Sequence, residues 1–128
     1  MTYYFNKILR MPFPDVITRV VDGLKTEGFG VLTEIDVKET MKRKLDVDFP
    51  NYRILGACNP PFAYRALQIE DKIGTLMPCN VIVQEQTPGE VEVAAVNPMV
   101  SMQAVNKPEL REVAEEVTAR LQRVIDRL

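Results

Sequence analysis

The sequence predicts an α+β protein, in which helices pack on one face of an antiparallel β-sheet. Apolar residues recur with the 3.6-residue period of an amphipathic helix near both ends of the chain. Between these helices, several short segments alternate apolar and polar residues, as half-buried strands do. The chain has 128 residues, so we expect one domain spanning residues 1–128.

The first long helix is expected to follow a strand. Residues 3–10, YYFNKILR, are aromatic and partly alternating, which predicts a strand that ends before Pro12. Apolar residues then recur at i, i+1, i+4, i+5 and i+8, and Gly28 stands where a glycine ends a helix. The residues of this stripe are Val16, Ile17, Val20, Val21 and Leu24.

The middle of the chain predicts two strands separated by a short helix. Residues 30–37, GVLTEIDV, alternate as a strand does, and residues 52–57, YRILGA, predict another. Between them, residues 38–45, KETMKRKL, predict a short helix. Met41 and Leu45 are four residues apart, so both are expected to face inward.

The second half contains the clearest strands. Prolines lead into a short helix over residues 60–71, PPFAYRALQIED. The segments 79–86, CNVIVQEQ, and 90–96, EVEVAAV, are joined by a Thr-Pro-Gly turn that predicts a hairpin. The last helix is expected over residues 107–127, with acids early and arginines late, which complements the helix dipole.

Charge and composition exclude several classes of function. The chain has 16 Lys and Arg against 18 Asp and Glu, a net charge of −2, and so lacks the basic excess typical of nucleic-acid binding. It has no histidine, which excludes Ser-His and Cys-His nucleophile pairs and histidine-ligated zinc within the chain. Any general base must therefore be Asp, Glu, Lys, Tyr or Cys.

The two cysteines match no zinc or redox spacing, because twenty residues separate them. They are expected to be free thiols in a reducing compartment. The N-terminal residues lack the apolar core of a signal peptide, and no segment approaches the roughly 20 apolar residues of a membrane span. We therefore expect a complete cytoplasmic protein with no membrane partner.

Three segments together closely resemble a known family. They are residues 28–37, GFGVLTEIDV, residues 48–67, DFPNYRILGACNPPFAYRAL, and residues 74–85, GTLMPCNVIVQE. Over essentially the whole chain, the sequence resembles the prokaryotic domain-of-unknown-function family 302. The resemblance implies a fold like one repeat of the TATA-box-binding protein, β-α-β(4)-α, with two main helices on one face of the sheet. It also implies a homodimer, and it brings no established activity. Some relatives are fused or adjacent to thiol- and sulfur-handling proteins.

Two Cys-Asn pairs next to prolines form the candidate site. We expect Cys58, Asn59, Cys79 and Asn80 to line a pocket between the sheet and the short helix that begins near Pro61. Arg65 is a further candidate, because its forked guanidinium suits a carboxylate or phosphate. The structural alternative is that Asn59 caps the helix and Cys58 is a small buried hydrophobic residue.

The sequence leaves three functions open. The leading hypothesis is a small-molecule binding module. The second is a thiol-dependent redox or sulfur-transfer protein, in which the positive end of the short helix lowers the pKa of Cys58. In that case Cys58 and Cys79 could also form a reversible disulfide or bind a soft ion such as Cu(I). The third is a structural or regulatory dimer that binds a protein partner. Neither a cofactor nor a metal is assigned.

Overall fold

The computed structural model describes residues 2–128. Five strands form one sheet in the order β1-β5-β4-β3-β2, and every neighbouring pair is antiparallel. The elements are β1 (Tyr4–Leu9), α1 (Phe13–Thr26), β2 (Gly30–Asp36), α2 (Val37–Leu45), β3 (Asn51–Cys58), α3 (Pro60–Ile69), the 3-10 helix η1 (Asp71–Leu76), β4 (Cys79–Thr87), β5 (Glu90–Val96), α4 (Pro98–Ser101) and α5 (Pro108–Asp126). The predicted α+β class and the β-α-β(4)-α order of the main elements are confirmed.

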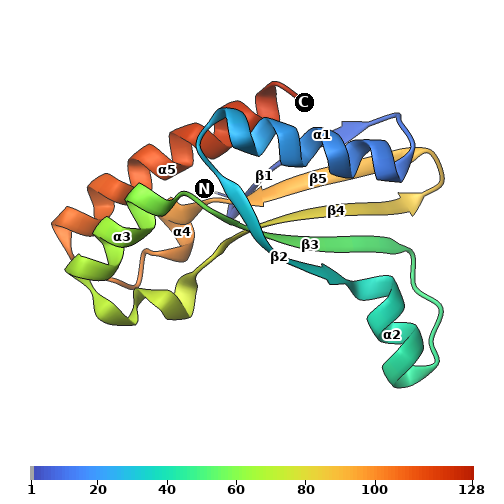
Figure 1. Ribbon diagram of the computed structural model, residues 1–128, viewed down its shortest axis with the longest axis horizontal. Helices are drawn as coiled ribbons and strands as arrows, with labels where there is room; N and C mark the ends of the chain where they lie inside the picture. The colour runs from blue at the N-terminus through green and yellow to red at the C-terminus, as the bar shows by residue number, and fades with distance from the viewer. Residues whose placement is uncertain (1) are drawn as a thin grey trace.

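Helices α1 and α5 lie side by side on one face of the sheet (Figure 1). Alternate strand residues point toward them and are buried, because successive side chains of a strand face opposite sides. The predicted helix stripe is confirmed at Val16, Val20 and Leu24, each fully buried. Burying such a side chain stabilises the fold by about 1.5–3 kcal/mol. The strand residues of this core are Leu55, Ala57, Val81, Val83, Val91, Val93 and Ala95.

The predicted hairpin between β4 and β5 is confirmed. Val83 is opposite Val93, and the register shifts by a bulge between Gln84 and Thr87. Gly89 has a φ of 83°, which a residue with a side chain rarely adopts. Its N–H donates to the Glu85 carboxylate at 3.0 Å. Turn chemistry in the sequence therefore determines this part of the fold.

Helix α2 differs from its prediction. It begins as expected for a capped helix, since the Asp36 carboxylate accepts a hydrogen bond from the Glu39 N–H at 3.0 Å. Its apolar residues do not face a core, however: none of its nine described residues is buried, and Leu45 is 66% exposed. The inward orientation predicted for Met41 and Leu45 is wrong. Figure 1 gives the reason, because α2 projects from the end of the sheet, away from the layer of α1 and α5.

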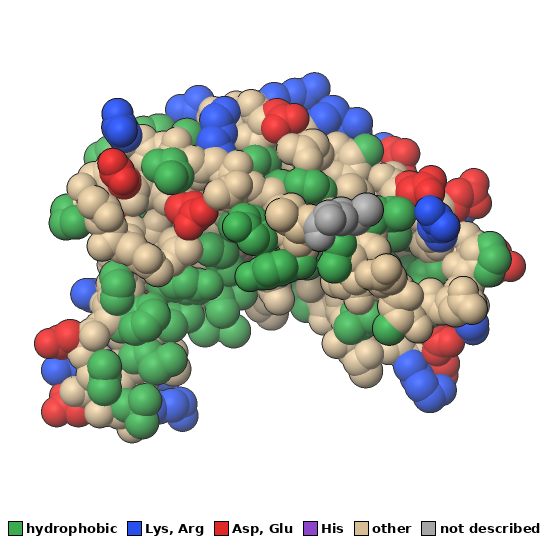
Figure 2. Space-filling model, turned by 180° about the vertical axis from the view of Figure 1, so that it is seen from behind, with side chains coloured by type: hydrophobic (Ala, Val, Ile, Leu, Met, Phe, Trp, Pro, Cys, Tyr) green, Lys and Arg blue, Asp and Glu red, His purple; other side chains and the backbone are tan. Residues whose placement is uncertain are grey.

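The second face of the sheet is open. Within residues 2–128 no helix covers it in the way that α1 and α5 cover the first face. In Figure 2, seen from behind, hydrophobic side chains gather along the concave lower side of the molecule, below the sheet. Separately, no helix in the described part of the chain has both the length and the apolar character needed to cross a bilayer.

Candidate functional site

A pocket of about 290 Å³ lies where helix α3 leaves the sheet and packs beside α5. Its wall is almost entirely apolar, and most of it comes from α3, α5 and the segment that leads into β4. The lining residues are Phe29, Leu32, Ala57, Cys58, Asn59, Phe62, Ala63, Ala66, Leu67, Gly74, Met77, Pro78, Cys79, Met102, Val113, Ala114 and Val117.

Strand pairing brings the two cysteines to the same pocket. Cys58 is the last residue of β3 and Cys79 is the first residue of β4. These strands are antiparallel, and Ala57 is opposite Cys79, so the end of one strand adjoins the start of the other. Pro60 then begins α3, since proline is well tolerated in the first helical turn. Both cysteines are free and partly buried.

Both thiols are less acidic than ordinary cysteines. Burial raises the pKa of Cys58 above its usual value. Burial also raises the pKa of Cys79, to about 11, and a negative charge on Cys58 would contribute to that rise. The helix N-terminus was expected to lower the pKa of Cys58, and this expectation is wrong: the pKa is raised, and burial of the thiol is the cause. At neutral pH the pocket holds two protonated thiols.

Asn59 lines the pocket, but its amide group is engaged elsewhere. It is buried, and its Nδ2 donates to the backbone oxygen of Glu27 at 3.0 Å. Within the described chain its side chain makes no capping bond to α3, although it occupies the N-cap position. Asn59 instead ties the start of α3 to the end of α1.

The other two residues singled out in the sequence lie outside this pocket. Asn80 follows Cys79 on β4, so its side chain points to the opposite face, where it lines the hollow of the open face. Arg65 is on the outer side of α3, and its terminal nitrogen lies 3.4 Å from the carboxylate of Glu112. The structure brings together Cys58, Asn59 and Cys79, and separates Asn80 and Arg65 from them.

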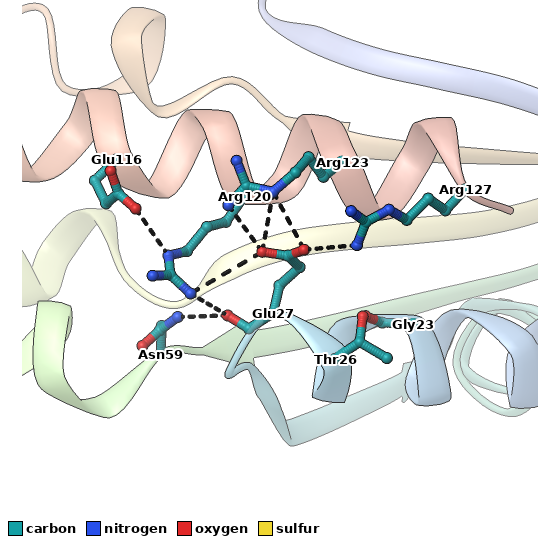
Figure 3. A network of polar contacts seen from close by, with 8 residues as sticks. All are labelled: Gly23, Thr26, Glu27, Asn59, Glu116, Arg120, Arg123 and Arg127. Carbon is teal, nitrogen blue, oxygen red and sulfur yellow. Dashed lines mark hydrogen bonds and ion pairs between the residues drawn. The ribbon is translucent and has the colours of Figure 1, made fainter.

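A buried carboxylate beside the pocket was not anticipated from the sequence. Glu27 directly follows α1, and its side chain is only 8% exposed because arginines of α5 cover it (Figure 3). Arg123 donates from Nε and a terminal nitrogen at 2.9–3.2 Å, and Arg127 donates at 2.9 Å. The hydrogen bond from Arg123, with the positive charges of Arg123, Arg127 and Arg120, outweighs burial and lowers the pKa of Glu27.

This cluster also supports the pocket wall. Arg120 donates to the Glu27 backbone oxygen at 3.2 Å, the same oxygen that accepts from Asn59. Its guanidinium lies 5.2 Å from the ring centre of Phe62, which lines the pocket. The sequence did show arginines at i, i+3 and i+7 in the last turns of α5 and at the residue that follows it, a spacing that places them on one side of the helix. That spacing could not identify Glu27, which lies more than ninety residues earlier in the chain.

The site offers soft sulfur atoms and no set of hard ligands. Met77 and Met102 add two thioethers to the two thiols of the wall. Among residues 2–128, no group of three or more His, Cys, Asp or Glu side chains is arranged to hold a metal ion. The arrangement therefore suits contact with an apolar, polarisable molecule.

Comparisons with known proteins agree with the fold. The model of a family described as "Domain of unknown function DUF302" matches residues 5–128. A crystal structure of an uncharacterized conserved DUF302 protein from Bacillus stearothermophilus has a TM-score of 0.90 and 30% identity, over 99% of this chain and 98% of that one. An uncharacterized protein from Aquifex aeolicus (strain VF5) is 27% identical over 94 residues, which are 73% of this chain. The chain thus spans only 59% of the length of that curated relative.

Proposed function

Because the chain belongs to the DUF302 family, whose description names no activity, we propose its function from the pocket: the protein binds a small, uncharged, largely apolar molecule between α3, α5 and the sheet. The observation that carries this proposal is the composition of the wall. Cys58, Asn59 and Cys79 are the lining residues with polar or thiol side chains, and the rest of the wall is apolar. The amide nitrogen of Asn59 already donates to the backbone oxygen of Glu27.

Charge is unfavourable in this pocket. A carboxylate or ammonium group taken from water into an apolar wall loses its hydration, and this costs several kcal/mol unless a partner replaces it. The nearby arginines are directed at Glu27, and Arg65 is directed at Glu112. The ligand is therefore expected to be neutral.

The volume limits the ligand to a small molecule. Ligand pockets commonly measure about 300–1,000 Å³, and this one, at about 290 Å³, is at the lower end of that range. An apolar cavity of about 150 Å³ is already large enough to hold benzene. A single ring or a short branched chain would fill the space, and Met77, Met102 and the thiols would contact it through polarisable sulfur.

The thiol-based alternative has less support. Nucleophilic and redox cysteines react as the thiolate. An environment that lowers the pKa of the cysteine favours this form. Burial here raises the pKa of both Cys58 and Cys79. In this proposal the thiols act as apolar wall groups.

A two-part experiment tests the binding proposal. First, the purified protein is weighed under native and denaturing conditions, and its organic extract is analysed by gas chromatography. A neutral small molecule lost on denaturation is the expected result. Second, protein labelled with ¹³C at the methionine methyl groups is titrated with toluene. The signals of Met77 and Met102 should shift, whereas that of Met41 on α2, outside the pocket, should not.

A matched pair of variants controls the experiment. Ala63→Phe places a ring in the pocket and should abolish both the extracted molecule and the toluene shifts. Ala119→Phe adds the same ring at an exposed position of α5 and should leave both unchanged. Methyl signals of Met77 and Met102 that stay fixed at saturating toluene would overturn the proposal.

A further inference from the structure

A second cavity adjoins the apolar pocket at the start of α5. This outer cavity measures about 540 Å³ and is lined by α4, the first turns of α5 and the segment that joins them. The two helices pack against one another (Figure 1). Met102 and Ala114 line both the outer cavity and the pocket. The two spaces therefore meet at these two side chains.

Both cavities follow the same helix. On α5, the outer cavity is lined by residues from Pro108 to Ala114, and the pocket is lined by residues from Val113 to Val117. From Pro108 to Val117 the helix rises about 14 Å, at 1.5 Å per residue. A ligand that occupied both spaces would therefore be longer than a single aromatic ring.

The two cavities differ in chemistry. The pocket wall is apolar apart from the thiols and Asn59, whereas polar side chains supply part of the wall of the outer cavity. These are Gln103, Asn106, Lys107 and Arg111. Gln103 and Asn106 are exposed, and their amide groups can both donate and accept hydrogen bonds. One end of the combined space thus suits hydrocarbon, and the other suits a hydrogen-bonding group.

The cations of the outer cavity are paired with acids of the same chain. Lys107 Nζ lies 2.9 Å from the Glu70 carboxylate and donates to the backbone oxygen of Ile69 at 3.2 Å. Arg111 Nε lies 3.4 Å from the Glu115 carboxylate. A carboxylate ligand would have to compete with Glu70 and Glu115 for these cations. The outer cavity therefore favours a neutral head group.

We propose that the two cavities form one elongated site for a neutral amphiphile, with its alkyl chain in the pocket and its hydroxyl or amide head in the outer cavity. This inference rests on the proposed function, because it keeps the same pocket and adds the chemical class of the ligand. Each methylene that enters the pocket leaves water, which favours binding. The head group exchanges water for the amides of Gln103 and Asn106, so it keeps its hydrogen bonds.

Met102 forms an adaptable boundary between the two parts of the site. It is half-buried and packs against the core. Its unbranched side chain has three rotatable bonds, so it can change its path without a shift of the backbone. Ala114 is buried and adds only a methyl group to the shared wall. We expect a bound chain to pass from one cavity to the other by displacing the Met102 side chain.

Methionine methyl groups report on the two parts of the site separately. Of the two cavities, Met77 lines only the pocket, Met99 lines only the outer cavity, and Met102 lines both. In protein labelled with ¹³C at the methionine methyl groups, n-octanol should shift the signals of all three. Toluene should shift only those of Met77 and Met102. Met41 on α2 is outside both cavities, and its signal should stay fixed.

Intermolecular nuclear Overhauser effects test the orientation of bound octanol. They should join the Met77 methyl group to the terminal methyl group of octanol, and the Met99 methyl group to the methylene beside the hydroxyl. The reverse pattern, or effects confined to Met77 and Met102, would overturn the inference. Toluene shifts at Met77 and Met102 would still support the binding proposal in that case, so the two proposals can fail separately.

A double variant tests the polar end of the site. Gln103→Ala combined with Asn106→Ala removes both amide groups, and the exposed positions should leave the fold intact. Octanol binding should weaken about threefold to tenfold, as expected for lost hydrogen bonds to a neutral group, and toluene binding should not change. Gln122→Ala, on α5 outside both cavities, is the control and should change neither affinity. Unchanged octanol affinity in the double variant would contradict the role given to the outer cavity.

Octanoate tests the charge of the head group. Octanol and octanoate have chains of equal length and differ only in the head group. At pH 7 octanol should bind at least about tenfold more tightly, because the carboxylate loses hydration without gaining a free cation. Tighter binding of octanoate would overturn the assignment of a neutral ligand.

Discussion

Arg123 on α5 holds the carboxylate of Glu27, at the end of α1, through two of its guanidinium nitrogens at 2.9–3.2 Å. The two residues are 96 positions apart in the chain. Their contact fixes the end of one main helix against the last turns of the other. The backbone oxygen of Glu27 extends the link to Asn59, so the same point anchors one side of the pocket.

Replacing Glu27 should destabilise the protein. Glu27→Gln removes the negative charge from a cluster of three arginines and weakens several charged hydrogen bonds, with an expected loss of about 1–3 kcal/mol in unfolding free energy. Urea unfolding followed by circular dichroism measures this. Glu116→Gln is the control, because the half-exposed Glu116 forms an ion pair with Arg120 at the edge of the cluster, and its loss should cost less than about 0.5 kcal/mol. Equal losses in the two variants would contradict the role given to Glu27.

The contribution of Glu27 should disappear in acid. Its pKa is lowered in the folded chain, chiefly by the hydrogen bond from Arg123, so the ionised form is the one that stabilises folding. The stabilisation should be complete above the ordinary carboxyl pKa of about 4.5 and should decline as the pH falls through the lower folded value. The difference in unfolding free energy between the wild type and Glu27→Gln, measured from pH 7 to pH 3, should therefore shrink below pH 4.5. A constant difference would show that the charge of Glu27 is not the cause.

The cysteines should react slowly at neutral pH. With a pKa of about 11, Cys79 is expected to be a thiolate in only about one molecule in ten thousand at pH 7. Iodoacetamide should alkylate native Cys58→Ser protein far more slowly than the same protein in urea, and the native rate should rise steeply up to about pH 11. Rapid alkylation of the native thiol at pH 7 would instead favour the thiol-based function.

A side chain at Gly28 should destabilise the protein. Its φ is 86°, and a Cβ there would lie 3.1 Å from the Asn59 amide nitrogen, which is bonded to Glu27. Gly28→Ala should therefore cost about 1–2 kcal/mol in unfolding free energy through backbone strain, and more if Asn59 is displaced. Gly30→Ala is the control, because a Cβ at Gly30 meets nothing within 4 Å. Thermal unfolding compares the two variants, and similar melting temperatures would refute this role of Gly28.

Local sequence patterns determined most of the fold. The stripe at Val16, Val20 and Leu24 and the alternation at Val91, Val93 and Ala95 depend only on which side of a helix or strand each residue faces. The hairpin depends on the positive φ of Gly89, which the turn itself requires and which involves no residue distant in sequence. The sequence also predicted that Cys58, Asn59 and Cys79 lie at or next to strand ends, because prolines mark those ends.

Tertiary structure decided the features that depend on partners distant in sequence. The period of α2 predicted that Met41 and Leu45 share a face, but only the path of the chain beyond β2 directs that face away from the core. Successive residues of a strand face opposite sides of the sheet, which separates the side chain of Asn80 from that of Cys79. Which of the two faces holds the pocket, however, depends on how α3 and α5 pack. Burial, which raises the pKa of the thiols, and the pairing of Glu27 with Arg123 likewise arise only when distant segments meet. Through short-range stereochemistry, the sequence by itself determined the elements and, for α1, α5 and the core strands, the faces that point inward. The pocket, its electrostatics and the exposed helix were decided by long-range packing.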